Sequence, residues 1–286
     1  MTVIRRVRTA VVSAALVVAV LLTGVSLTAS PAYAITGGYP VQADIRGASL
    51  VHLQMGTAGC SGVLITPEWV LTARHCIPET TVPGSAIVGP SLLTGPKRGI
   101  AEVRRHPSVD LAVVRLSSPV PTPIAGLSGA HQHPGAPATV TGWGGWKSNP
   151  YPVAQQADTT IERRIINLPG PFPSMILLEA PIRNGRLLPG DSGGALWVNG
   201  QVAGILSMST STSTPAQDGT MGWYIPVAEH LDWIAYHTGA PTPRVSGHTS
   251  PLVDARQHPP LIPVAQTISL PILHENSSSP LAIGSH

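Results

Sequence analysis

The chain has 286 residues, of which 43 % are hydrophobic and 11 % charged, and its formal net charge is +3. This apolar content is enough for a sizeable core, which excludes disorder throughout the chain. No dense stripe of Lys and Arg is present, which excludes nucleic acid as the main partner. The 29 glycines and 30 prolines favour many short strands and turns over long helices.

The N-terminus has the three-part layout of a secretory signal peptide. Arginines within residues 5–8 precede an apolar run over residues 10–27, and the small-residue sequence Ala-Tyr-Ala follows at 32–34. A retained transmembrane anchor is the alternative, but polar residues interrupt the run and a cleavage site follows it. We therefore predict that residues 1–34 are a signal peptide and that the protein is secreted to the extracellular space, without a stable membrane anchor.

Residues 35–239 alternate short apolar runs with Gly, Pro and Ser breaks, a pattern that predicts an all-β sandwich or barrel. A helix is expected at the end of this region, where Val227, Leu231 and Ile234 fall on one face and Gly239 can terminate it. The Ser/Thr-rich stretch 207–219 is predicted to be a polar loop.

Beyond this region, residues 240–286 form a tail rich in Pro, Ser and His, with no steady apolar period. Such a composition predicts a flexible C-terminal extension or a loosely packed appendage. No function is assigned to it from the sequence.

Cys60 and Cys76 are the only cysteines. In an oxidising compartment, a pair that closes a loop of about seventeen residues is predicted to form a disulfide, worth roughly 3 kcal/mol in the chain-entropy model. Two unpaired buried thiols are the alternative. The disulfide is favoured because it would hold His75 immediately beside the covalent link.

Three residues in separate motifs have complementary chemistry. A serine hydroxyl is a weak nucleophile at neutral pH, so it needs a base, and the base needs a partner that fixes its tautomer and stabilises its cation. Ser192 lies in PGDSGGAL, His75 in VLTARHC and Asp110 at the start of DLAVVRL. Considered alone, such an Asp is most often a turn former and such a His most often structural. The joint pattern is much rarer.

These motifs, with ITGG at 35–38, TGWG at 141–144 and GWYIPV at 222–227, resemble the trypsin-like serine proteases of the chymotrypsin family, of the secreted bacterial type. They follow that family's order of His, Asp and Ser and cover nearly all of residues 35–238. The resemblance implies two packed six-stranded antiparallel β-barrels with a C-terminal helix. It also implies a monomeric serine endopeptidase that acts on proteins or peptides without a cofactor.

The resemblance assigns a role to each catalytic candidate. Ser192 would attack the scissile carbonyl to form an acyl-enzyme, His75 would act as general base and then general acid, and Asp110 would orient His75. The backbone N–H groups of Gly190 and Ser192 would form the oxyanion hole.

It also implies an activation ion pair between Asp191 and a newly released α-amino group. Signal cleavage after Ala34 would leave Ile35 as the first residue of the mature chain. We therefore predict that removal of the signal peptide activates the enzyme without a separate propeptide.

Substrate contacts are implied at Ser207, along the substrate channel, at the backbone of Met208 and Ser209, and at Gly222, which would leave the pocket open. In that family, the residue six positions before the nucleophile often forms the floor of the specificity pocket. In this chain that residue is Arg186. On the pocket floor it would attract acidic side chains, and in the alternative it points to solvent. The preference at P1, the substrate residue before the scissile bond, is therefore not assignable from the sequence.

Two other function classes compete with an active peptidase. One is a catalytically weak or inactive protease-fold protein with a binding or regulatory role. The other is an esterase or lipase, which requires Ser before Asp and His in the chain and so does not fit. His131 and His133 lack a cysteine or acidic partner at ligand spacing, so no metal site is predicted.

Overall fold

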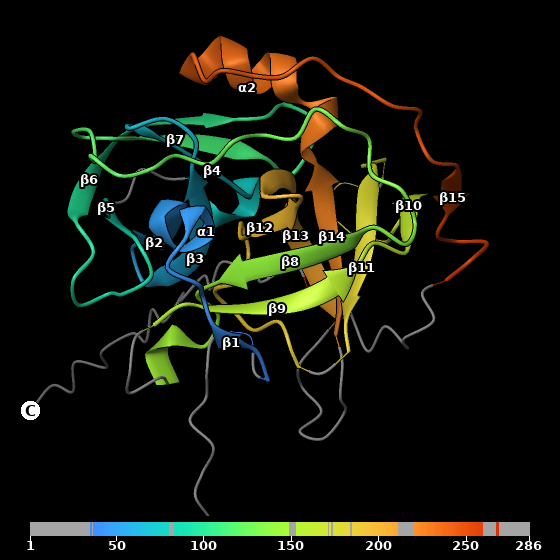
Figure 1. Ribbon diagram of the computed structural model, residues 1–286, viewed down its shortest axis with the longest axis horizontal. Coiled ribbons are helices and arrows are strands. Elements are labelled where there is room, and N and C mark those ends of the chain that lie inside the picture. Colours follow the sequence, from blue (N-terminus) through green and yellow to red (C-terminus); the bar gives the residue numbers. More distant parts are fainter. Residues whose placement is uncertain are drawn as a thin grey trace, which may run out of the picture. The chain divides into compact units, whose positions relative to one another are not determined.

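The computed structural model describes residue 35 and residues 37–79, 83–148, 153–170, 172, 174–183, 185–210, 220–259 and 267–268. Most of these residues lie in strands or in the turns that join them (Figure 1). The helical elements are α1 (Ile45–Ser49), α2 (Leu231–Thr238) and the 3-10 turns η1 (Arg74–Cys76), η2 (Trp146–Ser148) and η3 (Val227–Glu229). The predicted all-β class with a C-terminal helix is confirmed.

The first half of the fold is a closed antiparallel barrel with strand order β2-β3-β4-β7-β6-β5. Its strands are β2 (Leu50–Met55), β3 (Ala58–Leu64), β4 (Trp69–Thr72), β5 (Gly84–Val88), β6 (Lys97–Arg105) and β7 (Ala112–Leu116). Alternate residues of β4 and β7 fill two different cores: Val70 and Val114 lie inside the barrel, whereas Leu71 and Val113 pack with the second half. Burial on both faces explains the continuous apolar runs of these strands.

The second half is a ten-stranded sheet with the order β1-β9-β8-β12-β13-β14-β11-β10-β15, in which β16 pairs with β13 off this path. Its strands are β1 (Tyr39–Pro40), β8 (Pro137–Gly142), β9 (Gln155–Thr160), β10 (Arg163–Ile166), β11 (Leu177–Ile182), β12 (Ala195–Val198), β13 (Gln201–Thr210), β14 (Thr220–Pro226), β15 (Leu252–Asp254) and β16 (Thr267–Ile268). The sheet curves until β9 meets β11, where Thr159 Oγ1 donates a hydrogen bond of 2.6 Å to the Pro181 carbonyl. It thus carries more strands than the six predicted for the second barrel, and three of the ten, β1, β15 and β16, come from the N-terminal segment and the tail.

The C-terminal helix ends as the sequence predicts. Gly239 adopts the left-handed conformation with φ of 65°, and its N–H donates to the Ala235 carbonyl at 2.9 Å. Leu231 and Ile234 are buried in the core shared by the two halves. No helix within the described residues is long and apolar enough to cross a membrane.

Two segments expected to be irregular contribute strands. Residues 252–254 of the tail pair in parallel with β10, and Ala255 joins the shared core, so the tail begins with a packed segment. Strand β13 continues through Thr210, into the stretch predicted to be a loop. The predicted signal peptide, 1–34, and residues 211–219 lie outside the described residues.

Candidate active site

His75 and Asp110 meet because the strands beside them are paired. His75 lies in η1, just after β4, and Asp110 lies just before β7, while Thr72 of β4 is opposite Ala112 of β7. His75 Nδ1 is 2.7 Å from Asp110 Oδ2, and the His75 backbone N–H donates to Oδ1 at 2.8 Å. Both carboxylate oxygens therefore hold the histidine, one through its ring and one through its backbone.

The Asp110 carboxylate is buried, with 3 % of the residue exposed, and it is still well satisfied. Ser207 Oγ donates to Oδ2 at 2.6 Å. Burial opposes ionisation, but the charge of His75 and the hydrogen bonds from His75 and Ser207 lower the pKa of Asp110 below its usual value. Asp110 is therefore an anion at neutral pH, as an orienting partner for His75 requires.

Ser192 lies in the turn that precedes β12, close to the residue that follows His75. Its carbonyl accepts a hydrogen bond of 2.8 Å from the Ser61 N–H and lies 3.7 Å from Sγ of Cys76, the neighbour of His75 in the chain. His75 Nε2 is buried and has no hydrogen-bond partner among the described residues. The structure thus joins His75 to Asp110 and places the Ser192 backbone beside Cys76, the neighbour of His75, while no hydrogen bond within the described residues joins Ser192 Oγ to His75 Nε2.

The predicted disulfide is present and anchors this arrangement. Cys60 of β3 and Cys76 of η1 are joined, with their Cα atoms 6.0 Å apart. The two sulfur atoms and a His75 nitrogen lie within 4.8 Å of one another, but both sulfurs are used in the disulfide. A thiolate metal site is therefore not available at this place.

The glycines around Ser192 shape the predicted oxyanion hole. Gly190 and Gly193 have φ angles of 106° and 79°, which favour glycine. A Cβ on Gly193 would lie 2.2 Å from Thr72 Oγ1 and 2.3 Å from the Ser61 carbonyl. In the described part of the chain, no hydrogen bond uses the N–H groups of Gly190 and Ser192. Both donors are free to bind an incoming oxygen.

Ser61 supports this turn, a role that the sequence did not reveal. Its Oγ donates to the Gly190 carbonyl at 2.8 Å and accepts from the Trp143 N–H at 2.8 Å. Its carbonyl accepts from Thr72 Oγ1 at 2.7 Å. The available signal was its position directly after Cys60 in CSGVLI, but the contact with Gly190 spans 129 residues of chain.

We expect Ser61→Ala to lower kcat by about 10- to 100-fold with little change in KM, a barrier increase of roughly 1–3 kcal/mol from the loss of buried hydrogen bonds to the turn. Steady-state kinetics check this result. Ser49→Ala is the matched control, since Ser49 is also buried but its Oγ donates to the Ile45 carbonyl within α1. An unchanged kcat in Ser61→Ala would show that the hydroxyl does not position Gly190.

Asp191 is fully buried, and the Ile35 N–H is directed to its carboxylate. Its carboxylate accepts backbone hydrogen bonds from Gly144 at 2.6 Å, from Leu188 at 2.8 Å and from Ile35. Burial raises the pKa of Asp191 to about 7 despite these three donors. Ile35 has no exposed surface and a φ of 49°, which is strained for a β-branched residue. The two residues of the predicted activation pair are thus neighbours, and the ion pair itself stays a prediction.

The predicted substrate residues lie on adjacent strands. Met208 and Ser209 of β13 are opposite Trp223 and Gly222 of β14. Met208 is buried and its side chain packs in the shared core, so its predicted backbone contact with a peptide stays a prediction. Arg186 is half-buried, and its two alternative positions, on the pocket floor or toward solvent, stay predictions.

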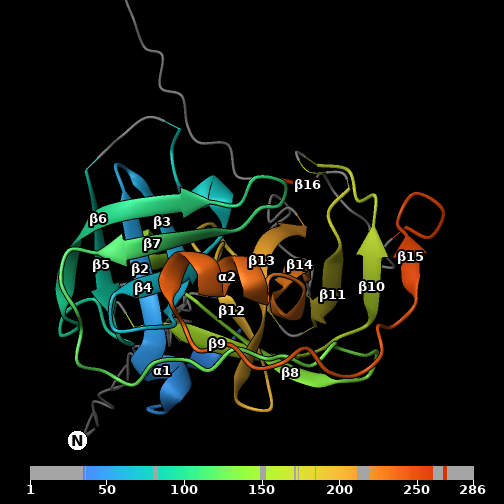
Figure 2. The ribbon, with the colours of Figure 1, turned by 90° about the horizontal axis from the view of Figure 1, so that it is seen from above.

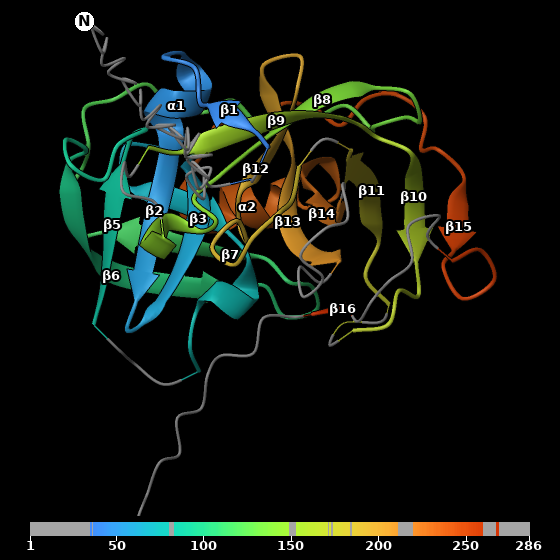
Figure 3. The same ribbon diagram turned by 90° about the horizontal axis from the view of Figure 1, so that it is seen from below.

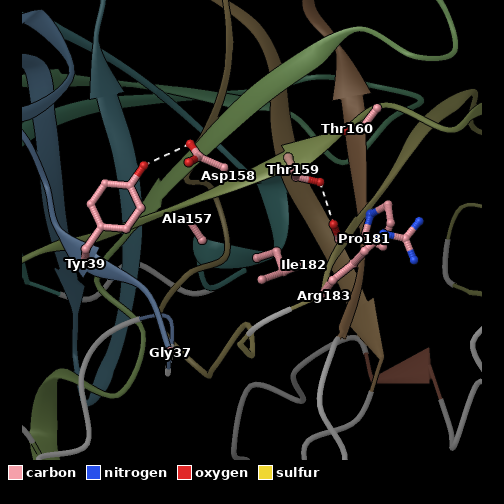
Figure 4. A pocket seen from close by; sticks show the side chains of 9 residues that line it. All are labelled: Gly37, Tyr39, Ala157, Asp158, Thr159, Thr160, Pro181, Ile182 and Arg183. Atoms are coloured by element: carbon pink, nitrogen blue, oxygen red, sulfur yellow. Dashed lines mark hydrogen bonds between the residues drawn. The ribbon is translucent and has the colours of Figure 1, made fainter.

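A separate pocket of about 400 Å³ lies between β1, β9 and β11 (Figure 4). Its polar groups have partners within the chain: Asp158 accepts from Tyr39 Oη at 2.9 Å, and Arg183 pairs with Glu162. None of the predicted site residues lines this pocket.

A closed β-barrel beside a second β-sheet, with His75 held by Asp110 near the Ser192 turn, is the arrangement expected of a serine peptidase. The comparisons agree with this class: the Trypsin family matches residues 35–234, and the chain belongs to that family. By this membership it is a hydrolase, a serine peptidase.

The relatives extend over most of the chain. A protein named "Uncharacterized peptidase" from Corynebacterium glutamicum (strain R) is 46 % identical over 84 % of this chain and 86 % of its own length. "Anionic trypsin" from Canis lupus familiaris is 29 % identical over 70 % of this chain and 87 % of its own. The solved structure of "Kallikrein-related peptidase 10" matches with a TM-score of 0.55 at 24 % identity, covering 71 % of this chain and all of that one, which shows a common fold.

Proposed function

We propose that this protein is a secreted serine endopeptidase that cleaves peptide bonds with Ser192, His75 and Asp110. The geometry of His75 carries the proposal. Its Nδ1 is held by Asp110 at 2.7 Å, while its buried Nε2 has no partner within the described chain. With the proton on Nδ1, the lone pair of Nε2 is available to a serine hydroxyl.

The reaction follows from these positions. His75 Nε2 takes the proton of Ser192 Oγ as this oxygen attacks the peptide carbonyl, and the oxyanion accepts hydrogen bonds from the Gly190 and Ser192 N–H groups. The tetrahedral intermediate collapses as His75 returns the proton to the leaving amine. Water then repeats the sequence on the acyl-enzyme, releases the acid and restores Ser192. Asp110 stabilises the histidinium in both steps.

Activation is proposed to occur on removal of residues 1–34. Cleavage before Ile35 converts its peptide N–H into an α-ammonium group, a cationic partner for the buried Asp191 carboxylate. It also removes the preceding residue and with it the φ strain of Ile35. The N–H contact between Ile35 and Asp191 supports this proposal. Asp191 lies between Gly190 and Ser192 in the chain, so the ion pair would stabilise the oxyanion-hole turn.

A chain that keeps residues before Ile35 should lose stability as the pH rises from about 4 to 7, by up to about 1.4 kcal/mol per pH unit. The sign follows from the raised pKa of Asp191, about 7 when folded, because the folded state then holds a proton that the unfolded state has lost. In the chain that begins at Ile35, the ammonium partner should abolish this decline.

Urea unfolding across this pH range, for both chains, measures the effect. Asp191→Asn in the longer chain is the control and should remove the decline. An equal pH dependence in both chains would contradict the proposed pairing.

The proposed function is tested on the secreted protein, after its N-terminus has been sequenced. We expect an Ile35 terminus, cleavage of a peptide library varied at P1, and labelling of Ser192 by a fluorophosphonate, located by mass spectrometry. Cleavage after Asp or Glu would place Arg186 on the pocket floor. An Ile35 terminus with neither cleavage nor labelling would reject the proposal.

A further inference from the structure

Strand β13 has an open edge beside Ser192. Strand β13 pairs on one edge with β12 through Ile205, and on the other edge with β14 from Gly204 onward. The turn before β12 then bonds to Leu206, whose carbonyl accepts from Gly193 and whose N–H donates to Gly194. From residue 207 onward, β14 and β16 are the strands of the described residues that pair with β13. Without β16, the edge that continues from the Ser192 turn would have no paired strand among these residues.

A segment of the C-terminal tail occupies that edge. In β16, Ile268 is opposite Ser209 and Thr267 is opposite Thr210, in antiparallel register. Ser209 is already paired on its other edge with Gly222 of β14, so β16 lies on the edge continuous with the Ser192 turn. Figures 2 and 3 label β16 near the ends of β13 and β14.

The chain direction of β16 is toward the proposed catalytic residues. Ser207 donates to Asp110, and Ser209 is two residues further along β13, roughly 7 Å away at the usual rise of a strand. Strand β13 therefore runs away from the His75–Asp110 pair. The antiparallel β16 runs toward it, as an extended peptide entering the site would.

We propose that Thr267–Ile268 competes with substrate for this edge, so that the tail is an intramolecular inhibitor of the peptidase. Strand addition uses backbone hydrogen bonds, which do not require a particular side chain. Because the segment is tethered, its effective concentration is set by the linker and does not change on dilution. The inhibitory effect rests on the proposed function, whereas the docking of β16 does not.

The test compares Thr267→Pro/Ile268→Pro with Thr267→Ala/Ile268→Ala in the otherwise full-length mature chain. Neighbouring strand residues direct their N–H groups to opposite sides, so two prolines remove the donor facing β13 whichever residue supplies it. Two alanines change the same side chains and keep both N–H groups. The readouts are amide hydrogen exchange over Met208–Thr210 and the KM for a peptide substrate.

In the diproline variant, we expect faster exchange at these amides and a KM at least about threefold lower, with kcat unchanged, since a tethered occupant has been released. The dialanine variant should match the parent. Unchanged exchange in the diproline variant would overturn the docking, and faster exchange with an unchanged KM would overturn the inhibition. Faster exchange in a protein without activity would support the docking and reject the proposed function instead.

Discussion

Replacement of Ser192 by alanine is expected to lower kcat by about 10⁶-fold and leave the fold intact, because the nucleophile of a serine, histidine and aspartate set acts with its partners as a unit. The Ser192 contacts that hold the turn are made by its backbone, whose carbonyl accepts from Ser61. Alanine keeps them. Single-turnover and steady-state assays with the most reactive peptide measure the loss.

The matched control is Ser250→Ala. Ser250 is also buried, but its Oγ bonds to the Gln132 carbonyl, within a tail segment outside the predicted site. We expect this variant to keep the parent kcat. If Ser192→Ala kept an activity close to that of Ser250→Ala, Ser192 would not be the nucleophile.

Asp110→Asn is expected to lower kcat by about 10⁴-fold near neutral pH, with a much smaller change in KM. The carboxylate receives the His75 backbone N–H on one oxygen and faces the His75 ring on the other. An amide that keeps the first contact through its oxygen presents its NH₂ group to Nδ1. The proton then moves to Nε2, the nitrogen that must accept the proton of Ser192.

The kcat–pH profile separates this positioning effect from a general loss of structure. In the variant, the loss should diminish at high pH, where deprotonation by hydroxide can replace the histidine. Asp158→Asn is the control, since Asp158 bonds to Tyr39 Oη away from the site. Equal losses in both variants would show that the effect of Asp110→Asn does not come from His75.

The activation proposal and the tail proposal concern the same turn and strand. Ile35 contacts Asp191, which lies between the two proposed oxyanion donors, and β16 pairs with β13 two residues beyond Ser207. The N-terminal proposal concerns the shape of the turn and predicts a change in kcat. The tail proposal concerns access to the strand and predicts a change in KM, so kinetics distinguish them.

Local patterns were sufficient for several features. The short β-branched runs and frequent turns predicted the all-β class, and the apolar face ending at Gly239 predicted the C-terminal helix. Cys60 and Cys76 had no other partners, so the disulfide followed from their number and from the predicted export. The motifs around His75, Asp110 and Ser192 retain enough local sequence to be recognised, and the structure joins His75 to Asp110.

The sequence by itself thus determined the class of fold, the disulfide and the candidate site. Only the tertiary structure decided the support of Gly190 by Ser61, the packing of the tail on β10 and the occupation of the β13 edge by β16. These features depend on backbone groups and on contacts between segments far apart in the chain. Backbone hydrogen bonds are hard to predict from residue types, because every residue except proline offers the same backbone donor and acceptor.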